Sequence, residues 1–243
     1  MQRDKDPMGA AIADYHRCGI AGRLRVFSPD FDEDGIPVET LFRSFDAMPH
    51  LEQLALRAAR GRTLDVGAGA GCHSLALQTM GVDVTAIDIS PLSVETMRQR
   101  GVIRAEEQDF WCVAEPYDTI LMLMNGIGIV GTLSEIPRFF RHIDTILAPD
   151  GQLLLDSSDL VYLYEDEDGH VEIPEGPYYG ELEYTMLYKR VKGSPFPWLY
   201  LDFATLQRVA AECGFQADLV AQGEHYDYLA RITRQASSLP PKN

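Results

Sequence analysis

The sequence LDVGAGAG at residues 64–71, followed by AIDIS at residues 86–90, decides the fold of this chain. Residues 62–66 are β-prone enough to form a buried parallel strand, and a run of glycines follows at once. Glycine has no Cβ, so the chain can turn sharply there and bring backbone N–H groups close to a ligand. A helix beginning near Ala70 would aim its unpaired N–H groups at the same point. The pattern predicts the nucleotide-binding half of a doubly wound α/β fold.

A carboxylate marks the end of the second expected strand. Asp88 lies 21 positions after Gly67, in the run VDVTAIDI. At that position an acid can accept two charge-assisted hydrogen bonds from a ribose diol. We therefore expect Asp88 to bind the ribose of a nucleotide cofactor, with an ordinary surface acid as the alternative.

The spacing of the glycines separates two kinds of cofactor. Gly67 and Gly69 fit the dinucleotide fingerprint G-x-G-x-x-G, but a cysteine stands at its sixth position. Gly71 instead gives G-x-G-x-G, and an acid, Asp65, precedes the run. This pattern, with the acid at the end of the second strand, resembles the class I S-adenosylmethionine-dependent methyltransferase family. The resemblance covers about residues 60–156 well and the rest of the chain loosely.

Three later stretches extend the resemblance: AEEQDFW at 105–111, YDTILMLMNGIG at 117–128 and ILAPDGQLLLD at 146–156. In the family, an acid after the third strand commonly contacts the adenine amino group, and Asp109 matches it. The end of the fourth strand, here Asn125, faces the methionine part of the cofactor. The resemblance implies S-adenosylmethionine as cofactor. The binding positions that it implies are Asp65, Gly67, Ala68, Gly69, Gly71, His73, Asp88, Ile89, Gln108, Asp109, Phe110, Met124 and Asn125.

Several of these residues have a second interpretation. In the family, Asp65 helps to position the amino group of the cofactor, but it could also only hold the turn rigid. Asn125 could cap a helix or a turn. His73 could mainly orient the start of the helix. Gln108 and Phe110 are expected to flank the adenine base.

The core alternates strands with helices. This order predicts a doubly wound α/β fold with a mostly parallel seven-stranded sheet, helices on both faces and an antiparallel edge strand. The expected helices cover 71–80, 90–100, 133–147 and 201–215; the expected strands cover 62–66, 82–87, 102–106, 118–124, 151–156, 215–222 and 226–234. In the resembled family, the last two strands form an antiparallel pair at the sheet edge.

Five segments are expected along the chain. They are an N-terminal helical and extended cover (1–60), the cofactor-binding half of the domain (61–156), an inserted aromatic-rich cover on the substrate side (157–200), the C-terminal helix and strand pair (201–234) and a flexible tail (235–243). An insertion after the fifth strand would lie over the carboxyl ends of the strands, where ligands bind. Its aromatic residues could equally pack on the core. Within it, ELEYTMLYKRV is expected to pair as a strand with PWLYL.

Residues 38–60 are expected to be helical, with a possible break at Pro49. Arg43 in this segment could pair with the carboxylate of the cofactor or form a surface ion pair. The apolar face of the helix would hold Leu51, Leu54, Ala55 and Ala58.

The charge and hydropathy of the chain limit the classes of partner that the protein is expected to bind. The chain has 243 residues, with 37 acids against 21 bases and a net charge of −16. This charge repels phosphate backbones, and the end of the fourth strand lacks the Asn-Pro-Pro-aromatic run of methyltransferases that act on nucleic-acid amino groups, so no nucleic acid substrate is expected. No apolar run reaches the length of a membrane span, and the charged N-terminus lacks the core of a secretory signal. We expect no membrane partner and a cytoplasmic location.

Metal binding is not expected. The four cysteines are scattered, and the histidines have no mutual spacing typical of a metal site. The run DFDEDG at 30–35 begins like a calcium loop, but Leu41 stands where a bidentate glutamate is needed.

The predicted function follows from the cofactor. A sulfonium methyl is already a strong electrophile, so the protein needs to align it with a nucleophile and exclude water. A base is required only when the nucleophile must lose a proton early, and His225 is the candidate. We predict methyl transfer by in-line displacement to a small-molecule acceptor of unknown identity. A nicotinamide-dependent oxidoreductase and a non-catalytic cofactor-binding module are the alternatives.

Overall fold

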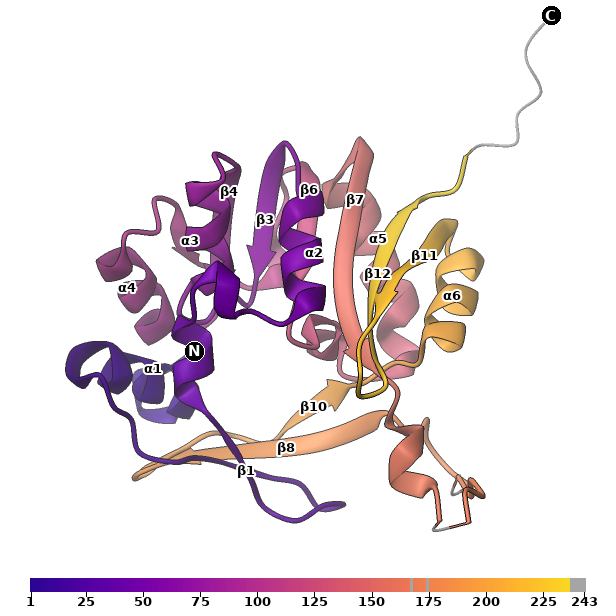
Figure 1. Cartoon of the computed structure of the whole chain (residues 1–243), viewed down its shortest axis with the longest axis horizontal. Coiled ribbons are helices and arrows are strands. Elements are labelled where there is room, and N and C mark those ends of the chain that lie inside the picture. Colours follow the sequence, from indigo (N-terminus) through magenta and orange to yellow (C-terminus); the bar gives the residue numbers. More distant parts are fainter. Residues whose placement is uncertain (167, 174, 237–243) are drawn as a thin grey trace, which may run out of the picture.

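The main sheet has seven strands (Figure 1). The computed structural model describes residues 1–236 except residues 167 and 174, so most of the expected flexible tail lies outside the described residues. The strand order is β11-β12-β7-β6-β3-β4-β5. The bounds are β3 (Arg62–Val66), β4 (Asp83–Asp88), β5 (Ala105–Glu107), β6 (Tyr117–Met122), β7 (Leu147–Ser158), β11 (Phe215–Gln222) and β12 (Asp227–Arg234).

Strands β3 to β7 pair in parallel, whereas β12 pairs antiparallel with both β7 and β11. The predicted sheet and its antiparallel edge are therefore confirmed. Helices lie on both faces: α2 (His50–Ala58), α3 (Cys72–Thr79) and α4 (Pro91–Arg100) on one, α5 (Ile136–Ile146) and α6 (Phe203–Glu212) on the other.

Burial of both faces explains the apolar strands. In β6, Ile120 packs in the cluster with α5 and α6, while Leu121 packs with α2 and α3. In β7, Leu153 packs in the first of these clusters and Leu154 in the second. Because successive side chains of a strand point to opposite faces, a strand covered on both sides needs a continuous apolar run.

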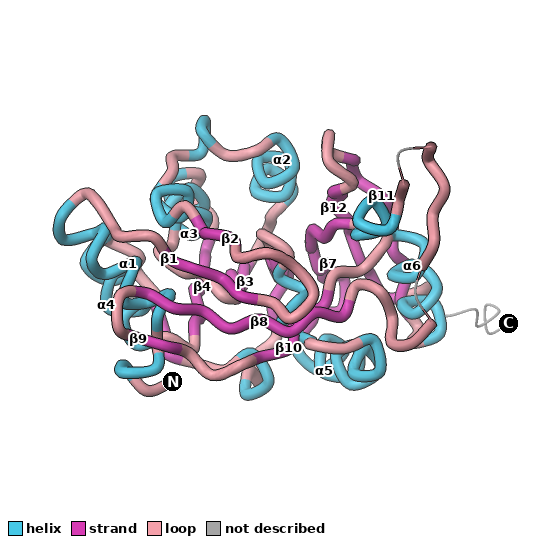
Figure 2. Tube along the Cα trace, turned by 90° about the horizontal axis from the view of Figure 1, so that it is seen from below, coloured by secondary structure: helices cyan, strands magenta, loops and turns pink. Residues whose placement is uncertain are grey.

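A second, smaller sheet lies across the carboxyl ends of the parallel strands (Figures 1 and 2). It runs in the order β10-β8-β1-β2, with β9 paired to β8. The bounds are β1 (Leu24–Phe27), β2 (Asp34–Ile36), β8 (Glu181–Tyr188), β9 (Val191–Lys192) and β10 (Phe196–Leu199). The predicted pairing of β8 with β10 is confirmed.

The N-terminal segment and the insertion build this sheet together, a pairing that the sequence patterns do not predict. Leu24 of β1 lies opposite Tyr188 of β8, far away along the chain. A short strand such as β1 becomes stable only when it pairs with others, and its register depends on that partner. Helix α1 (Pro7–Cys18) covers the sheet, and its Ile12 packs with Leu24 and Ala70.

Two local expectations were wrong. Residues before Pro49 form two 3₁₀ turns, Val38–Phe42 and Phe45–Ala47, instead of a helix. Met48 is extended, as is usual for a residue before proline. The helix after the glycine run begins at Cys72 rather than near Ala70, because Gly71 has a φ of 81° and cannot be helical.

The buried face of α2 also differs from the expected one. Leu51, Glu52, Ala55 and Leu56 are buried, while Ala58 is exposed. A glutamate thus lies on the apolar face, and its partner is described below.

Candidate active site

The glycine turn after β3 adopts the backbone that its sequence predicts. Gly67, Gly69 and Gly71 have φ values of 68°, 56° and 81°. A Cβ at Gly67 would meet nothing nearer than a methyl of Ile129 at 3.6 Å, and one at Gly69 nothing nearer than 3.9 Å. A Cβ at Gly71 would lie 2.9 Å from Val102. Gly71 therefore permits close packing with the residues after α4, whereas a Cβ at Gly67 or Gly69 would only touch one methyl group at ordinary contact distance.

Asp88, at the end of β4, holds this turn. Its Oδ2 accepts a hydrogen bond from the N–H of Gly69 at 2.9 Å, and its Oδ1 accepts one from the N–H of Ser90 at 2.8 Å. Each carboxylate oxygen keeps a second lone pair for another donor. Burial raises the pKa of Asp88 to about 6, although both hydrogen bonds oppose the shift. The group is therefore charged at neutral pH and becomes neutral in mild acid.

Two large apolar side chains are exposed beside this turn. Ile89 follows β4 and is 45% exposed, and Met124 follows β6 and is 41% exposed. A single exposed apolar residue is ordinary, but these two stand at the carboxyl ends of strands on either side of β3. The uncrowded glycines at 67 and 69, the free lone pairs on Asp88 and the exposed apolar side chains fit an adenosyl group, which presents a ribose diol and a flat base.

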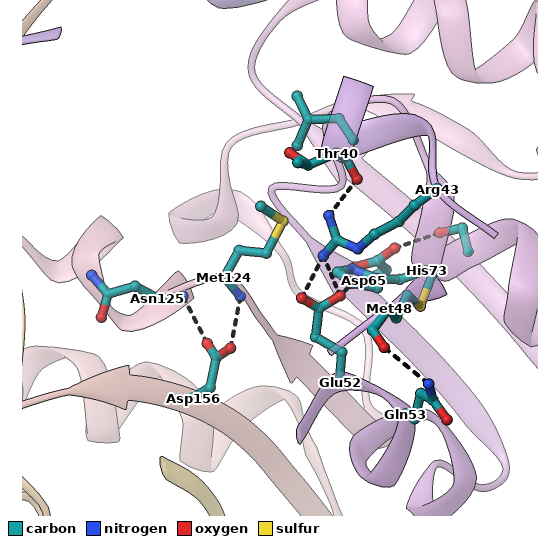
Figure 3. A network of polar contacts seen from close by, with 12 residues as sticks. Thr40, Arg43, Met48, Glu52, Gln53, Asp65, His73, Met124, Asn125 and Asp156 are labelled. Atoms are coloured by element: carbon teal, nitrogen blue, oxygen red, sulfur yellow. Dashed lines mark hydrogen bonds and ion pairs between the residues drawn. The ribbon is translucent and has the colours of Figure 1, made fainter. Parts of the chain in front are cut away.

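A chain of buried ions lies beneath the turn (Figure 3). The guanidinium of Arg43 pairs with the carboxylate of Glu52, which also contacts Nε2 of His73 at 2.6 Å. The hydroxyl of Ser74 donates to Asp65 at 2.6 Å. The contact between Glu52 on α2 and His73 in the first turn of α3 joins these two helices.

The pKa values in this network follow from burial and pairing. Burial disfavours the charged form of His73, but the hydrogen bond to Glu52 and the charges of Asp65 and Glu52 outweigh it, so the pKa of His73 is raised. Burial would raise the pKa of Glu52, yet the hydrogen bonds from His73 and Arg43 lower it overall. Burial raises the pKa of Asp65, against the opposing charge of His73. The network therefore favours charged His73 and Glu52.

The side chain of Arg43 is only 10% exposed, so the expected surface ion pair is wrong. The physical reason is its acidic partner, Glu52, on the buried face of α2. Among the described residues, Nε of Arg43 is buried and has no hydrogen-bond partner. A pairing of Arg43 with the carboxylate of a cofactor stays a prediction.

The end of β6 is tied to the end of β7. Asp156 accepts hydrogen bonds from the N–H groups of Met124 at 3.1 Å and Asn125 at 2.7 Å. Both donors have left-handed backbones, with φ of 60° and 57°. Burial raises the pKa of Asp156 to about 6. Asp156 is not among the predicted site residues, although a polar residue after the apolar run LLL of β7 is a signal of the same kind as Asn125.

The side chain of Asn125 connects the two sheets. Its Nδ2 donates to the carbonyl of Leu199 at 3.1 Å, and its Oδ1 accepts from the hydroxyl of Ser157 at 2.7 Å. Ser157 in turn accepts from the N–H of Leu201 at 2.9 Å. Asn125 makes no side-chain cap, so its structural role is this tether rather than the expected alternative of capping.

The adenine side of the site needs one correction. Asp109 is exposed and caps a 3₁₀ turn by accepting from the N–H of Trp111 at 3.0 Å, and Gln108 donates to the carbonyl of Cys112. Phe110, however, is only 3% exposed and packs on Phe139. The turn that Asp109 starts rotates the Phe110 ring into the core, so this side chain cannot flank a base.

Two predicted site residues remain, Ala68 and His225. Ala68 is buried in the glycine turn, and its N–H donates to the carbonyl of Ile87. His225 lies exposed in the turn between β11 and β12, and in the described part of the chain its imidazole has no hydrogen bond, so its role as a base stays a prediction. Within the described residues, no group of three or more His, Cys, Asp or Glu could hold a metal ion. No described helix is long and apolar enough to cross a membrane.

Comparisons with known proteins agree with this geometry. A family model described as "Methyltransferase domain" matches residues 41–216. The crystal structure of a SAM-dependent methyltransferase from Bacteroides fragilis, in complex with S-adenosyl-L-homocysteine, is 55% identical, covers 97% of this chain and 98% of that chain, and has a TM-score of 0.92.

Two curated proteins are 31% identical over shorter segments. One is the cypemycin N-terminal methyltransferase of a Streptomyces species, with 42% of this chain matched to 44% of that protein. The other is the protein-L-isoaspartate O-methyltransferase of Methylorubrum populi, with 48% of this chain matched to 59% of that protein. The chain thus spans about half the length of the curated relatives that it matches.

Proposed function

The chain belongs to the methyltransferase domain family and uses S-adenosylmethionine, and from this premise we propose that it methylates a small-molecule acceptor by in-line displacement. The observation that carries the proposal is the second sheet, which lies across the carboxyl ends of the parallel strands and is tied there by Asn125 and Ser157. Ligands of doubly wound sheets bind at those strand ends. An acceptor must therefore fit between the two sheets, which favours a small molecule over a duplex.

Particular residues would hold the cofactor. Asp88 would accept hydrogen bonds from the ribose diol, and Gly67 and Gly69 would leave room for it. Arg43, whose Nε is buried without a partner among the described residues, and Asp65 would lie on the side of the methionine carboxylate and amino groups. When bound, S-adenosylmethionine supplies an electrophilic methyl group on a sulfonium. The two sheets would orient the acceptor and exclude water.

The overall charge supports the same acceptor class. The net charge of −16 disfavours nucleic acids, whose phosphate backbones it repels. Oxidoreductase chemistry with a nicotinamide cofactor loses its support, because the glycine spacing does not fit and the family model is that of a methyltransferase. A module that binds the cofactor without turnover is the remaining alternative, and the experiment below separates it from an enzyme.

The test combines binding with turnover. Calorimetry first measures the affinity for S-adenosylmethionine, and release of S-adenosylhomocysteine is then followed with a panel of small amines, alcohols, thiols and carboxylates. Release that depends on an acceptor, and that Asp88→Ala reduces, supports the proposal. The matched control is Asp83→Ala, because Asp83 lies at the other end of β4 and is exposed. Tight binding with no acceptor-dependent release would contradict the proposal and favour the non-catalytic module.

A further inference from the structure

The face of the second sheet that looks toward the main sheet carries a group of tyrosines. Trp198 of β10 lies opposite Leu182 of β8 and packs so closely on Gly128, after β6, that a Cβ there would clash with its ring. Side chains two residues apart on a strand share a face, so Tyr184 points the same way as Leu182. The hydroxyls of Tyr184 and Tyr200 lie 3.4 Å apart.

A carboxylate lies on the same face of the second sheet as this pair. Burial raises the pKa values of both Tyr184 and Tyr200. Met186, two residues after Tyr184 in β8, lies opposite Val26 of β1, so Tyr184 and Val26 point to the same face of the sheet. Asp34, at the start of β2, is exposed and lies opposite Val26 of β1. Asp34 and the tyrosines come from distant parts of the chain and share this face only in the folded protein.

The group stands at the reacting end of the site. The neighbours of Tyr200 on both sides are fixed to the main sheet: the carbonyl of Leu199 accepts from Asn125, and the N–H of Leu201 donates to Ser157. Tyr200 is therefore held directly beside the end of β6, where the resembled family places the methionine part of the cofactor. By contrast, Tyr178 and Tyr179 hydrogen-bond to Asp202 and Asp159, and these bonds explain them as structural residues.

Few positive charges lie in the segments that build this region. Arg25 of β1 lies opposite Leu187, on the other face of the sheet from Tyr184, and pairs with Glu33. Residues 151–188 contain ten Asp and Glu and no Lys or Arg. Residues 105–137 contain six acids, residues 28–42 contain five, and neither range contains a Lys or Arg. Arg43, the next base along the chain, is paired with Glu52. An anionic acceptor would find no cationic side chain in these segments, whereas a cation would be attracted electrostatically.

We propose that the acceptor is a basic amine, captured in its ammonium form against the rings of Tyr184 and Tyr200 and near the carboxylate of Asp34. Aromatic faces attract cations through their quadrupole, and the attraction strengthens as water is removed. The inference rests on the proposed methyltransferase function and names the acceptor of that same site.

The chemistry of such a transfer balances without another reactant. The ammonium first gives a proton to water, which frees the nitrogen lone pair. The nitrogen attacks the methyl carbon, a new N–C bond forms, and the C–S bond breaks with its electron pair moving onto sulfur. The sulfonium becomes a neutral thioether, and the positive charge moves to the methylated nitrogen, beside the same tyrosines.

The test compares two probes of nearly equal size and shape, tetramethylammonium and tert-butanol. The full-length protein is first saturated with S-adenosylhomocysteine, whose affinity is measured by calorimetry, and each probe is then titrated by NMR. Tetramethylammonium is expected to bind at least about tenfold more tightly than tert-butanol. Tyr184→Leu and Asp34→Asn should each weaken its binding about three- to tenfold, while Tyr184→Phe, which keeps the ring, should retain most of it.

Asp32→Asn is the matched control. It removes one charge from the same exposed segment, two residues before Asp34, and should leave binding of tetramethylammonium unchanged. Equal affinity for the two probes would overturn the inference, as would binding that neither Tyr184→Leu nor Asp34→Asn weakens. A protein that fails to bind S-adenosylhomocysteine would contradict the proposed function first, and the inference with it. If Tyr184→Leu misfolds and no longer binds S-adenosylhomocysteine, the effect of Asp34→Asn, a substitution at an exposed residue, still tests the inference.

Discussion

Replacing Asp88 by alanine is expected to weaken the binding of S-adenosylmethionine roughly 10- to 160-fold. The carboxylate already accepts from the N–H groups of Gly69 and Ser90, which leaves one lone pair on each oxygen for the ribose diol. A hydrogen bond to a charged group contributes about 1.5–3 kcal/mol, and each 1.36 kcal/mol is a factor of ten. The factor given corresponds to the loss of one such bond, so loss of both diol contacts would exceed it.

The assay is calorimetric titration of S-adenosylmethionine and S-adenosylhomocysteine, with Asp83→Ala as control. Asp88→Asn separates lost binding from lost stability. Burial raises the pKa of Asp88 to about 6, so at pH 7.5 the folded protein holds a charge that burial disfavours. Asparagine keeps one acceptor oxygen and loses one of the two N–H bonds, but it also removes the buried charge, so we expect Asp88→Asn to bind more weakly and to melt at a higher temperature than Asp88→Ala. Unchanged affinity in both Asp88 variants would refute the assigned ribose contact.

Three further results are expected. The affinity of the wild-type protein for S-adenosylmethionine should fall as the pH is lowered through about 6, where Asp88 becomes protonated. The fall should be at most about tenfold per pH unit. Calorimetry should find the same fall in Asp156→Asn but not in Asp88→Asn. Glu52→Gln should lower the free energy of unfolding in urea by about 3–5 kcal/mol, because it leaves the charges of Arg43 and His73 without their partner. The control Glu95→Gln, in an exposed pair with Arg3, should lower it by less than about 1 kcal/mol. Equal effects of the two variants would contradict the buried network. Ser157→Ala should speed hydrogen exchange at the N–H of Leu201, while Ser158→Ala should not, and protection unchanged in both would exclude the tether between the sheets.

The local part of the site could be predicted from the sequence. The glycine turn and Asp88 are close together along the chain, and their conformations follow from residue type: glycines for positive φ, an acid at a strand end. Their arrangement therefore needed little knowledge of the rest of the molecule. The same holds for the alternation of strands and helices, since apolar runs of that length need cover on both faces.

Contacts between distant segments could not be predicted in this way. The role of Glu52 could not be predicted because it lies on an apolar helix face, and its partners, Arg43 and His73, lie in other elements. The sheet that joins β1 to β8 depends on a pairing that neither strand specifies alone. Phe110 was misplaced for a related reason: a single turn started by Asp109 decides whether its ring faces the site or the core.

The measurement that tests the central claim most directly is transfer of a ¹³C-labelled methyl group from S-adenosylmethionine, followed by NMR with the panel of small acceptors. We expect the label to appear in a product only when an acceptor is present, with formation of an equal amount of S-adenosylhomocysteine. The proposed amine site further predicts that the labelled carbon is bonded to nitrogen. A protein that binds S-adenosylmethionine but moves no label to any acceptor would contradict the assignment as a small-molecule methyltransferase.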